Sequence, residues 1–424
     1  MNKSVALHTL GCKLNYSETS ALTRILEDNG YQKKDFTEVA DVYVVNTCSV
    51  TDNADKECRQ LVRRIQRKAP DSLVVITGCY AQLKPQEIAS IEGVDLVLGA
   101  AEKFNIIQHL NELTKGDSTK ICSCDIEQVT EFHAAHSLND RTRTFLKVQD
   151  GCNYNCSFCT IPMARGVSRS DTIDNVVSKV IQLAKDGVKE IVLTGINLGD
   201  FGTKHLLGDG LFEEEDLFML LKALDEVEGI QRFRISSIEP NLLSFEMIDF
   251  IAQSKKFMPH FHIPLQSGSN KILGMMRRRY KKELYIDKIR YIKNVMPHAS
   301  IGADVIVGFP GETEEDFRAT ADLIADNEIS YLHVFTYSER TDTTALDIKP
   351  IVPLRIRNDR NKILRNLSYQ KSQLFNSLHA GQTRPVLFER NSGNTIMEGY
   401  TDNYIKVSAP HQTEWANEIV QWKL

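Results

Sequence analysis

The 424-residue sequence lacks any apolar run long enough to cross a membrane. Its first residues, MNKSVALHTLGCKLN, have no long apolar core before a small-residue cleavage site, so a secretory signal is also missing. No internal repeat or low-complexity tract is visible, and glycine (23) and proline (12) are at ordinary levels. These absences exclude membrane-spanning, fibrous and disordered classes. We expect a cytoplasmic globular protein of about two to four domains.

An overall excess of positive charge is missing as well, because 56 acidic residues outweigh 51 basic ones and leave a net charge of −5. Such a total ordinarily counts against a nucleic-acid partner. Two local clusters depart from it, KECRQLVRRIQRK at 56–68 and RRRYKK at 277–282. Each cluster could contact a phosphate backbone, and each could equally be a solvated helix face.

Nine cysteines occur in this long chain without a secretory signal. Disulfides concentrate in short secreted proteins, whereas reducing compartments keep thiols free. The cysteines therefore indicate metal or redox chemistry rather than a disulfide framework.

Residues 1–115 alternate short apolar strands with amphipathic helices, which predicts parallel strands joined by helical crossovers. A helix is expected at 17–30, opening on Ser17 and closing on Gly30. The expected strands are 4–10, 42–47 and 72–78.

Each of these strands runs into a cysteine, so Cys12, Cys48 and Cys79 would lie at the strand C-termini, where ligands bind in open α/β sheets. Adjacent parallel strands would bring the three sulfurs within reach of one iron–sulfur cluster. Three buried, inert cysteines are an equally good interpretation of these residues alone. Three further cysteines lack such a setting and are expected to be spare thiols, although the last two could also bind metal or oxidise. These are Cys58, Cys122 and Cys124.

Residues 116–138 lose the alternation and are expected to be a linker or a crossing strand. A second α/β series over 139–370 contains about six strand–helix units, from the strand at 143–153 to that at 330–338. Six units make an incomplete version of the eight-unit barrel, whose chemistry lies at the strand C-termini. A helix is expected at 355–379. The last ~45 residues then change to short β-rich segments separated by the turn signals NSG and TDN, which predicts a small β-barrel or sheet.

The segment DGCNYNCSFCTIP places Cys152, Cys156 and Cys159 in a CxxxCxxC pattern. The small and polar residues between them allow the chain to wrap so that three thiolates reach one cluster. Iron–sulfur clusters ordinarily take four cysteines, so three leave one iron open for a catalytic ligand. A structural zinc site is disfavoured because no local Cys or His supplies a fourth ligand at a familiar spacing.

This triplet resembles the signature of the radical S-adenosylmethionine (SAM) superfamily, and a series of motifs resembles the methylthiotransferase family over nearly the whole chain. The motifs are GCKLNYSE, NTCSVT, TGCYAQ, DGCNYNCSFCTIPMARG, LTGINLGDFG, PLQSGS, MMRRRY and VGFPGET. The resemblance implies an α/β fold with three parts. They are an N-terminal Rossmann-like domain with an auxiliary cluster (1–115), a partial (βα)6 radical SAM barrel (139–370) and a small C-terminal β-barrel, TRAM, that binds tRNA (371–424).

The resemblance also implies SAM and two [4Fe-4S] clusters as cofactors. The catalytic cluster ligands would be Cys152, Cys156 and Cys159 for the radical SAM cluster, and Cys12, Cys48 and Cys79 for the auxiliary cluster. Each predicted SAM contact at a strand end could alternatively be a turn residue without a binding role, because glycine and serine are common in turns. The order and spacing of these residues along the chain disfavour that alternative for all of them together. The residues that would contact SAM are Phe158, Thr194, Gly195, Asn197, Arg234, Ser236, Gln266 and Ser267.

GCKLN at Cys12 and LTGINLGDFG resemble the branch that acts on N6-threonylcarbamoyladenosine at position 37 of tRNA. In the implied reaction one SAM methylates a cluster-associated sulfur, a second yields a 5′-deoxyadenosyl radical, and a methylthio group enters adenosine C2. The implied partners are the tRNA anticodon loop, an electron donor and a sulfur source. The alternative substrates are isopentenyladenosine of tRNA and a ribosomal-protein aspartate. A redox-sensing RNA-binding protein and a sulfur-free RNA methyltransferase are further hypotheses.

Contacts with tRNA are expected mainly in the C-terminal segment, through charge and stacking. Core packing is the commoner explanation for the aromatic candidates. The candidates are Arg384, Phe388, Arg390, Tyr400 and Tyr404. Near the catalytic face, three further arginines could contact the cluster, SAM or RNA. They are Arg165, Arg169 and Arg278.

Overall fold

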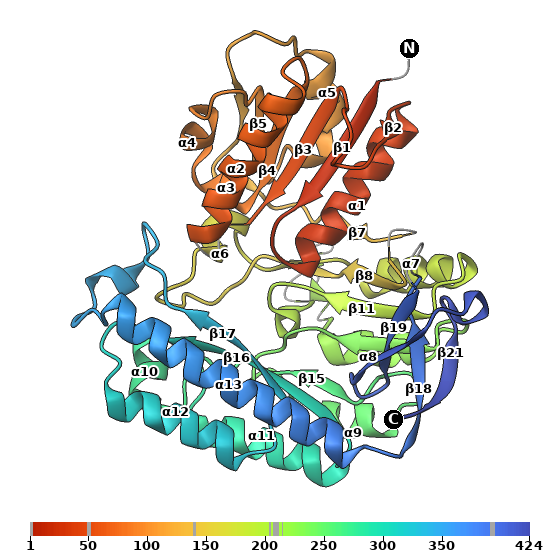
Figure 1. Cartoon of the computed structure of the whole chain (residues 1–424), viewed down its shortest axis with the longest axis vertical. Helices are drawn as coiled ribbons and strands as arrows, with labels where there is room; N and C mark the ends of the chain where they lie inside the picture. Colours follow the sequence, from red (N-terminus) through yellow and green to blue (C-terminus); the bar gives the residue numbers. More distant parts are fainter. Residues whose placement is uncertain are drawn as a thin grey trace. The chain divides into compact units, whose positions relative to one another are not determined.

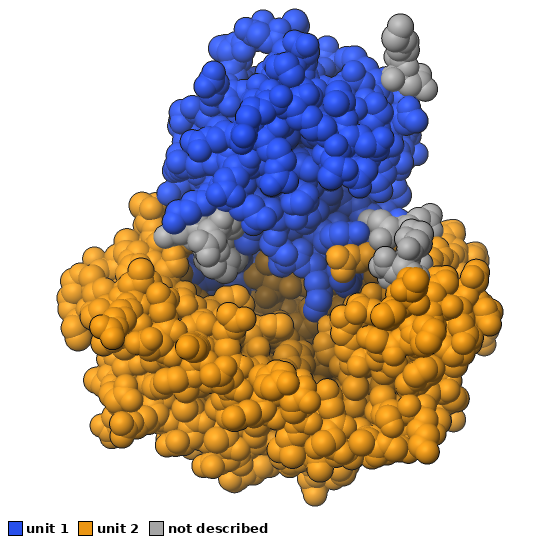
Figure 2. Space-filling view, in the orientation of Figure 1, with its two compact units in different colours: residues 1–140, 145–154, 159–170 blue, residues 141–144, 155–158, 171–424 orange. Residues whose placement is uncertain are grey.

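The computed structural model describes residues 3–48, 52–138, 141–202, 205–206, 212–213, 215–390 and 395–424. The chain divides into two compact units (Figure 2). Unit 1 consists of residues 1–140, 145–154 and 159–170, and unit 2 of residues 141–144, 155–158 and 171–424. The domain boundaries expected from the sequence stay a prediction. No helix among the described residues is long and apolar enough to span a bilayer.

Unit 1 is built on a parallel six-stranded sheet with the order β2-β1-β3-β4-β5-β6 (Figure 1). The strands expected from the sequence are confirmed as the neighbours β1, β3 and β4. The segment expected to be a linker or crossing strand contributes β6. The strands are β1 (Ser4–Thr9), β2 (Gln32–Lys33), β3 (Val42–Thr47), β4 (Leu73–Gly78), β5 (Leu96–Leu98) and β6 (Lys120–Cys122).

Helices pack on both faces of this sheet. Tyr43 and Val45 of β3 belong to the core that includes α2, whereas Val42 and Val44 belong to the core that includes α1 and α5. Successive side chains of a strand point to opposite faces, so an apolar run such as β3 requires cover on both sides. The helices are α1 (Lys13–Asp28), α2 (Asp52–Lys68), α3 (Cys79–Leu83), α4 (Pro85–Ala89) and α5 (Ile106–Asn111).

Helix α1 begins earlier than the sequence predicted. Cys12, with an extended backbone (φ −91°, ψ 172°), is its N-cap residue, so the prediction that Ser17 opens the helix is wrong. Ser17 is buried inside α1, and its hydroxyl donates to the Leu14 carbonyl (2.8 Å). The expected end is confirmed, because Gly30 follows the helix with φ +84°.

Unit 2 contains the parallel pair β11-β14 and the parallel sheet β15-β16-β17, which isolated parallel bridges join, and helices connect the strands (Figure 1). The strand–helix alternation expected for a partial barrel is therefore present. The strands are β11 (Glu190–Thr194), β14 (Arg232–Ile235), β15 (His260–His262), β16 (Ser300–Val307) and β17 (Tyr331–Thr336). The helices are α7 (Ile173–Lys185), α8 (Leu217–Asp225), α9 (Phe245–Gln253), α10 (Asn270–Met275), α11 (Lys282–Val295), α12 (Glu314–Asp326) and α13 (Leu354–Leu378).

Short elements occupy the segments between these series. In unit 1, β7 pairs with the end of β8, and β9 pairs with β10, both antiparallel. The elements are β7 (Ala135–His136), β8 (Arg143–Lys147), β9 (Gln149–Asp150), α6 (Ile161–Arg165), β10 (Arg169–Ser170), β12 (His205–Leu206) and β13 (Phe212–Glu213).

The C-terminal segment of unit 2 forms an antiparallel sheet with the order β20-β19-β18-β21. Its core contains Val386, Phe388 and Met397, with Trp415 and Trp422 packed against them. The sequence did not predict β21, and the expected NSG turn lies outside the described residues. The strands are β18 (Thr383–Phe388), β19 (Ile396–Thr401), β20 (Lys406–Pro410) and β21 (Ile419–Lys423).

Candidate active site

Cys12, Cys48 and Cys79 follow the C-terminal ends of β1, β3 and β4, three adjacent strands of the unit 1 sheet. Cys12 caps α1, Cys48 directly follows β3, and Cys79 is the first residue of α3. Cys48 and Cys79 are buried, whereas Cys12 is exposed. The three thiols thus share the edge of the sheet that the strand pattern of the sequence predicted for them. Their role as cluster ligands stays a prediction.

The backbone around these thiols is tightly packed. The side-chain amide of Asn15 donates to the carbonyls of Leu10 (2.9 Å) and Thr47 (3.0 Å), which ties the loop after β1 to the end of β3. Gly11 has φ +101°, and a Cβ atom there would lie 2.9 Å from the Cys48 Sγ. Glycine is therefore required at this position both for its conformation and for the close approach of the sulfur.

A buried ionic network lies in the same unit. Its acids are Glu18 and Asp150, and its bases are Lys103, Lys147, Arg165 and Arg169, all with side chains at most 9% exposed. Both lysines lie 2.9 Å from Glu18, and Lys147 lies 2.7 Å from Asp150. Sequence reasoning singled out only Arg165 and Arg169 among these residues, and Arg169 lies 3.8 Å from Asp150. A lysine inside the apolar strand RTFLKV was the available signal for the network.

Arg165, the last residue of α6, is the centre of this network. Its guanidinium donates to both oxygens of Glu18 (3.1 Å each), to Asp150 (2.9 Å) and to Asn15 (2.6 Å). Burial alone would lower the pKa of Arg165, but Asp150, Glu18 and the neighbouring Cys79 raise this pKa well above its usual value. Arg165 therefore joins the segment after the triplet to the residues that surround the sheet-edge cysteines.

The network holds four cations against two carboxylates, a net charge of +2 if all are ionised. Burial alone would raise the pKa of Glu18, but Arg165, Lys103 and Lys147 outweigh burial and hold it well below its usual range. Buried charge is costly unless it is compensated. The network therefore leaves a buried positive charge near Cys79 that its carboxylates do not balance.

Two cysteines of the CxxxCxxC triplet, Cys152 and Cys159, belong to unit 1, and the sulfur of each accepts a backbone N–H. The N–H of Tyr154 lies 3.4 Å from the Cys152 Sγ, and the N–H of Ile161 lies 3.4 Å from the Cys159 Sγ. The Cys152 N–H donates to the Gly166 carbonyl (3.1 Å), which closes the loop. Donors directed at sulfur stabilise the thiolate over the thiol.

In unit 2, the third triplet cysteine receives a charged donor. The Arg278 guanidinium donates to the Cys156 Sγ (3.1 Å) and forms an ion pair with Glu239. Burial raises the pKa of Cys156, and Arg278 opposes that rise. All three sulfurs of the triplet thus have N–H donors, which fits iron-bound thiolates. Arg278 thus contacts a triplet cysteine, and its contacts with a cluster, SAM or RNA stay predictions. Its partner Glu239 is a residue that the sequence did not single out.

Two predicted SAM contacts have buried polar atoms that lack a hydrogen-bond partner among the described residues, the Ser236 Oγ and the Gln266 Oε1. Gln266 also has φ +60°, which is strained for a residue with a side chain. Buried polar groups in proteins are normally paired. Both atoms follow the ends of strands in unit 2 and are suited to bind a polar ligand.

Arg234 and Ser267 are held by protein partners instead. The guanidinium of Arg234 donates to Glu190 (2.7 Å) and to the carbonyls of Thr401 (2.7 Å) and Asp402 (2.9 Å), so its fork secures the C-terminal sheet. The Ser267 hydroxyl accepts from the backbone N–H of the second residue after it (3.2 Å). Contacts of these two side chains with SAM stay predictions.

The other predicted SAM contacts lie in two segments. Thr194 ends β11, and Gly195 and Asn197 follow it. Phe158 packs edge-on against Phe309 at a centroid distance of 6.4 Å and is partly buried against the hydrophobic cluster that includes Ile272 of α10. These placements leave their contacts with SAM as predictions.

The C-terminal candidates for tRNA contact divide into buried, paired and exposed residues. Phe388 is fully buried against Trp415, so the prediction that it contacts RNA is wrong and the core interpretation is correct. Arg384 forms a bidentate pair with Asp402 (2.9 and 2.7 Å). Arg390 is exposed.

Tyr400 and Tyr404 were expected to offer stacking faces. Tyr404 instead stacks between Tyr400 (4.9 Å) and His260 (3.9 Å), and the Arg143 guanidinium lies 4.3 Å from the Tyr400 ring centroid. Both faces of the Tyr404 ring are therefore occupied within unit 2, and the ring is not free to stack on a base.

Cys58 is fully buried, and burial raises its pKa to about 12, which is the property of an inert thiol. Cys122 lies on β6 with its Sγ 3.5 Å from the Nδ1 atom of His109. Burial raises the pKa of Cys122 as well. Cys124 is partly exposed.

Comparison with known proteins identifies two family models, the uncharacterized protein family UPF0004 over residues 4–99 and the radical SAM superfamily over residues 146–324. The chain is 39% identical to the threonylcarbamoyladenosine tRNA methylthiotransferase MtaB of Bacillus subtilis, over 99% of this chain and 93% of that protein. It is 40% identical to the protein of the same name from Aquifex aeolicus, over 94% and 95%. Identity to the tRNA-2-methylthio-N(6)-dimethylallyladenosine synthase of Staphylococcus aureus is 29%, over 100% and 82%.

Among solved structures, the chain is similar to the radical SAM methyltransferase TsrM from Kitasatospora setae, which was solved with cobalamin and a [4Fe-4S] cluster. The TM-score is 0.55 at 16% identity, and the match covers 79% of this chain and 75% of TsrM. This similarity supports the fold alone.

Proposed function

The chain belongs to the threonylcarbamoyladenosine tRNA methylthiotransferase family, and from this premise we propose that it inserts a methylthio group at C2 of N6-threonylcarbamoyladenosine at position 37 of tRNA. The observation that carries the proposal is the identity of 39% and 40% to relatives of that name over 99% and 94% of the chain. The relative named for dimethylallyladenosine is less similar, at 29%. This difference favours the threonylcarbamoyl nucleoside as the substrate.

Membership of the radical SAM superfamily implies SAM and a [4Fe-4S] cluster, which Cys152, Cys156 and Cys159 would hold. When bound, a cluster with one open iron binds SAM and supplies the electron that cleaves it to a 5′-deoxyadenosyl radical. Ser236 and Gln266 would direct their unpaired polar atoms to SAM. The donors to the three sulfurs would stabilise the ligands in their thiolate form.

We assign an auxiliary [4Fe-4S] cluster to Cys12, Cys48 and Cys79. The support is their common sheet edge and the buried network beside it, whose net positive charge would offset anionic sulfur ligands. Arg165 would act as a positioning residue for this site, because it holds Asn15 and lies near Cys79. An electron donor and a sulfur source would be required as partners.

The experiment that tests this function is mass spectrometry of tRNA nucleosides from cells with and without the protein, followed by reaction of the anaerobic holoenzyme with tRNA and SAM. We expect 2-methylthio-N6-threonylcarbamoyladenosine only when the protein is present. Methylthiolation of isopentenyladenosine alone, or of a ribosomal-protein aspartate alone, would overturn the substrate. Absence of reductive SAM cleavage would overturn the enzyme assignment and favour a non-catalytic iron–sulfur RNA-binding protein.

A further inference from the structure

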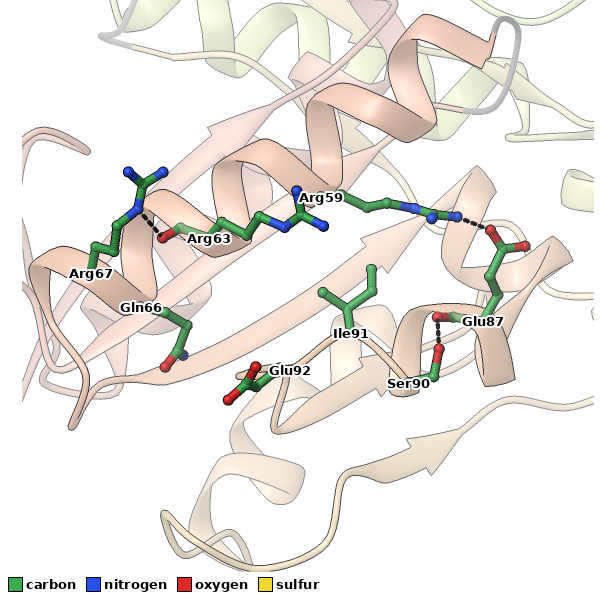
Figure 3. A pocket seen from close by; sticks show the side chains of 8 residues that line it. All are labelled: Arg59, Arg63, Gln66, Arg67, Glu87, Ser90, Ile91 and Glu92. Carbon is green, nitrogen blue, oxygen red and sulfur yellow. Dashed lines mark hydrogen bonds and ion pairs between the residues drawn. The ribbon is translucent and has the colours of Figure 1, made fainter.

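A groove of about 590 Å³ lies in unit 1 between α2 and the segment that runs from α4 toward β5 (Figure 3). Arg59, Arg63 and Arg67 of α2 form one wall, and Glu87 and Glu92 stand on the other. We call this feature the α2 groove. Its lining is mainly polar and charged, so it is unsuited to an apolar ligand.

The charges of the α2 groove are unevenly compensated. Arg59 forms an ion pair with Glu87 and donates to the Tyr80 hydroxyl (3.2 Å). Arg63 and Arg67 are exposed, and neither forms an ion pair within the part of the chain that the structure describes. From Arg59 to the end of α2 the sequence RQLVRRIQRK carries five basic residues and no acid. The groove lining therefore carries three arginines against two glutamates, a net positive charge, although the whole chain is acidic.

The groove is preformed rather than dependent on a ligand. The Gln66 amide donates to the Gly93 carbonyl (2.9 Å), which fastens α2 to the opposite wall. Gly93 has φ +92°, and a Cβ atom there would lie 2.2 Å from the Gln66 side chain. The Nε atom of Arg67 donates to the Arg63 carbonyl (3.2 Å), which anchors that side chain on the helix. Such order reduces the entropy that binding would cost.

The spacing of the arginines indicates the class of ligand. Arg59, Arg63 and Arg67 recur every four residues, so their Cα atoms advance by about 6 Å per step along one side of the helix. A row of guanidinium groups suits the repeated phosphates of a polyanion, because each group can bind phosphate oxygens in a bidentate manner. Compensation of the helix dipole accounts for bases in the last turn, but it does not require Arg59, Arg63 or the groove.

We propose that the α2 groove binds the phosphodiester backbone of the tRNA substrate, a role that rests on the proposed function. Helix α2 begins at Asp52, shortly after Cys48, so the groove belongs to the same α/β unit as the sheet-edge cysteines. Backbone contacts there would position tRNA without reading its sequence. They would also supplement the C-terminal sheet, in which Phe388 and Tyr404 are occupied by protein contacts.

The test is the salt dependence of tRNA binding to the anaerobic holoenzyme. For Arg63→Gln/Arg67→Gln we expect about tenfold weaker binding at moderate salt. The slope of log K against log salt should fall by about 1.4 to 1.8, because two phosphate contacts are lost. Arg63→Lys/Arg67→Lys should restore most of the slope. The matched control is Arg290→Gln/Arg318→Gln, which removes two exposed arginines of unit 2 and should leave the slope unchanged.

An unchanged slope in the groove variant, or an equal change in the control, overturns the proposal. Reductive SAM cleavage without tRNA and iron content should match the unmodified protein, which separates lost RNA contact from misfolding. The outcome is independent of the nucleoside that is modified. If the slope falls but no threonylcarbamoyladenosine is methylthiolated, the proposed substrate fails while the groove stands. If methylthiolation occurs and the slope is unchanged, the groove fails while the function stands.

Discussion

Replacement of Arg165 by methionine should destabilise the protein strongly, although no surface charge changes. The variant leaves Glu18 with two lysines and Asp150 with one, so neither carboxylate is bare. It removes the bidentate contact to Glu18 and the contacts to Asp150 and Asn15. Removing one partner of a buried ion pair costs about 3–5 kcal/mol, and the remaining lysines place this case near 3 kcal/mol.

The assay is urea denaturation of the anaerobic holoenzyme, with the free energy of unfolding of unit 1 followed by circular dichroism and iron release. The free energy of unfolding of Arg165→Lys should lie between those of the unmodified protein and Arg165→Met, since one ammonium group cannot replace the several donors of a guanidinium. Arg318→Met, at a side chain 73% exposed, should change stability by no more than about 0.5 kcal/mol. A loss below about 1 kcal/mol for Arg165→Met would refute the argument that this guanidinium secures the network. A double-mutant cycle with Glu18→Gln should give a coupling energy of about 2 kcal/mol.

Three further results are expected. Cys156→Ala should abolish 5′-deoxyadenosine formation, whereas Cys48→Ala should preserve reductive SAM cleavage and block sulfur insertion; equal loss of both activities in the Cys48 variant would contradict the two-site assignment. In native protein at pH 8, Cys58 should resist alkylation followed by mass spectrometry, since a pKa of about 12 leaves only about one thiol in 10,000 ionised; rapid labelling would show that its environment is more open than the structure indicates. Phe388→Ala should lower the free energy of unfolding by about 3–5 kcal/mol through loss of core packing, measured by thermal or urea denaturation; weaker tRNA binding with unchanged stability would instead restore an RNA contact.

The sequence predicted the parts of this molecule that depend on local pattern. Parallel strands that each run into a cysteine were recognisable because apolar runs and strand-end residues are adjacent in the chain. The start of α1 at Cys12 was missed because no cap residue marks it in the sequence. The first turn is instead held by Asn15, which donates to the Thr47 carbonyl at the end of β3, a residue distant in sequence. Phe388 was misjudged because β21, which supplies Trp422 to the same core, was not recognised.

The ionic network also depends on contacts between residues that are distant in sequence. Lys103 and Lys147 are 85 and 129 residues from Glu18, and no local spacing links them. Ser236 and Gln266 were found as candidates by family resemblance, whereas only the folded chain shows that their buried polar atoms lack a partner among the described residues. Sequence therefore locates the cysteines well, but the electrostatic surroundings that decide their chemistry emerge only on folding.

The attachment of the C-terminal sheet to β14 limits how this protein can evolve. Arg232 donates to the carbonyls of Tyr400 and Pro385, and Arg234 donates to those of Thr401 and Asp402. An RNA-binding module joined only by a tether could be exchanged between relatives by recombination. Here an exchange would remove the carbonyl acceptors of two buried guanidinium groups and leave both to the single carboxylate of Glu190. The sheet and the strand that holds it must therefore be inherited together, and hybrid proteins should tolerate a junction before β14 better than one at residue 380.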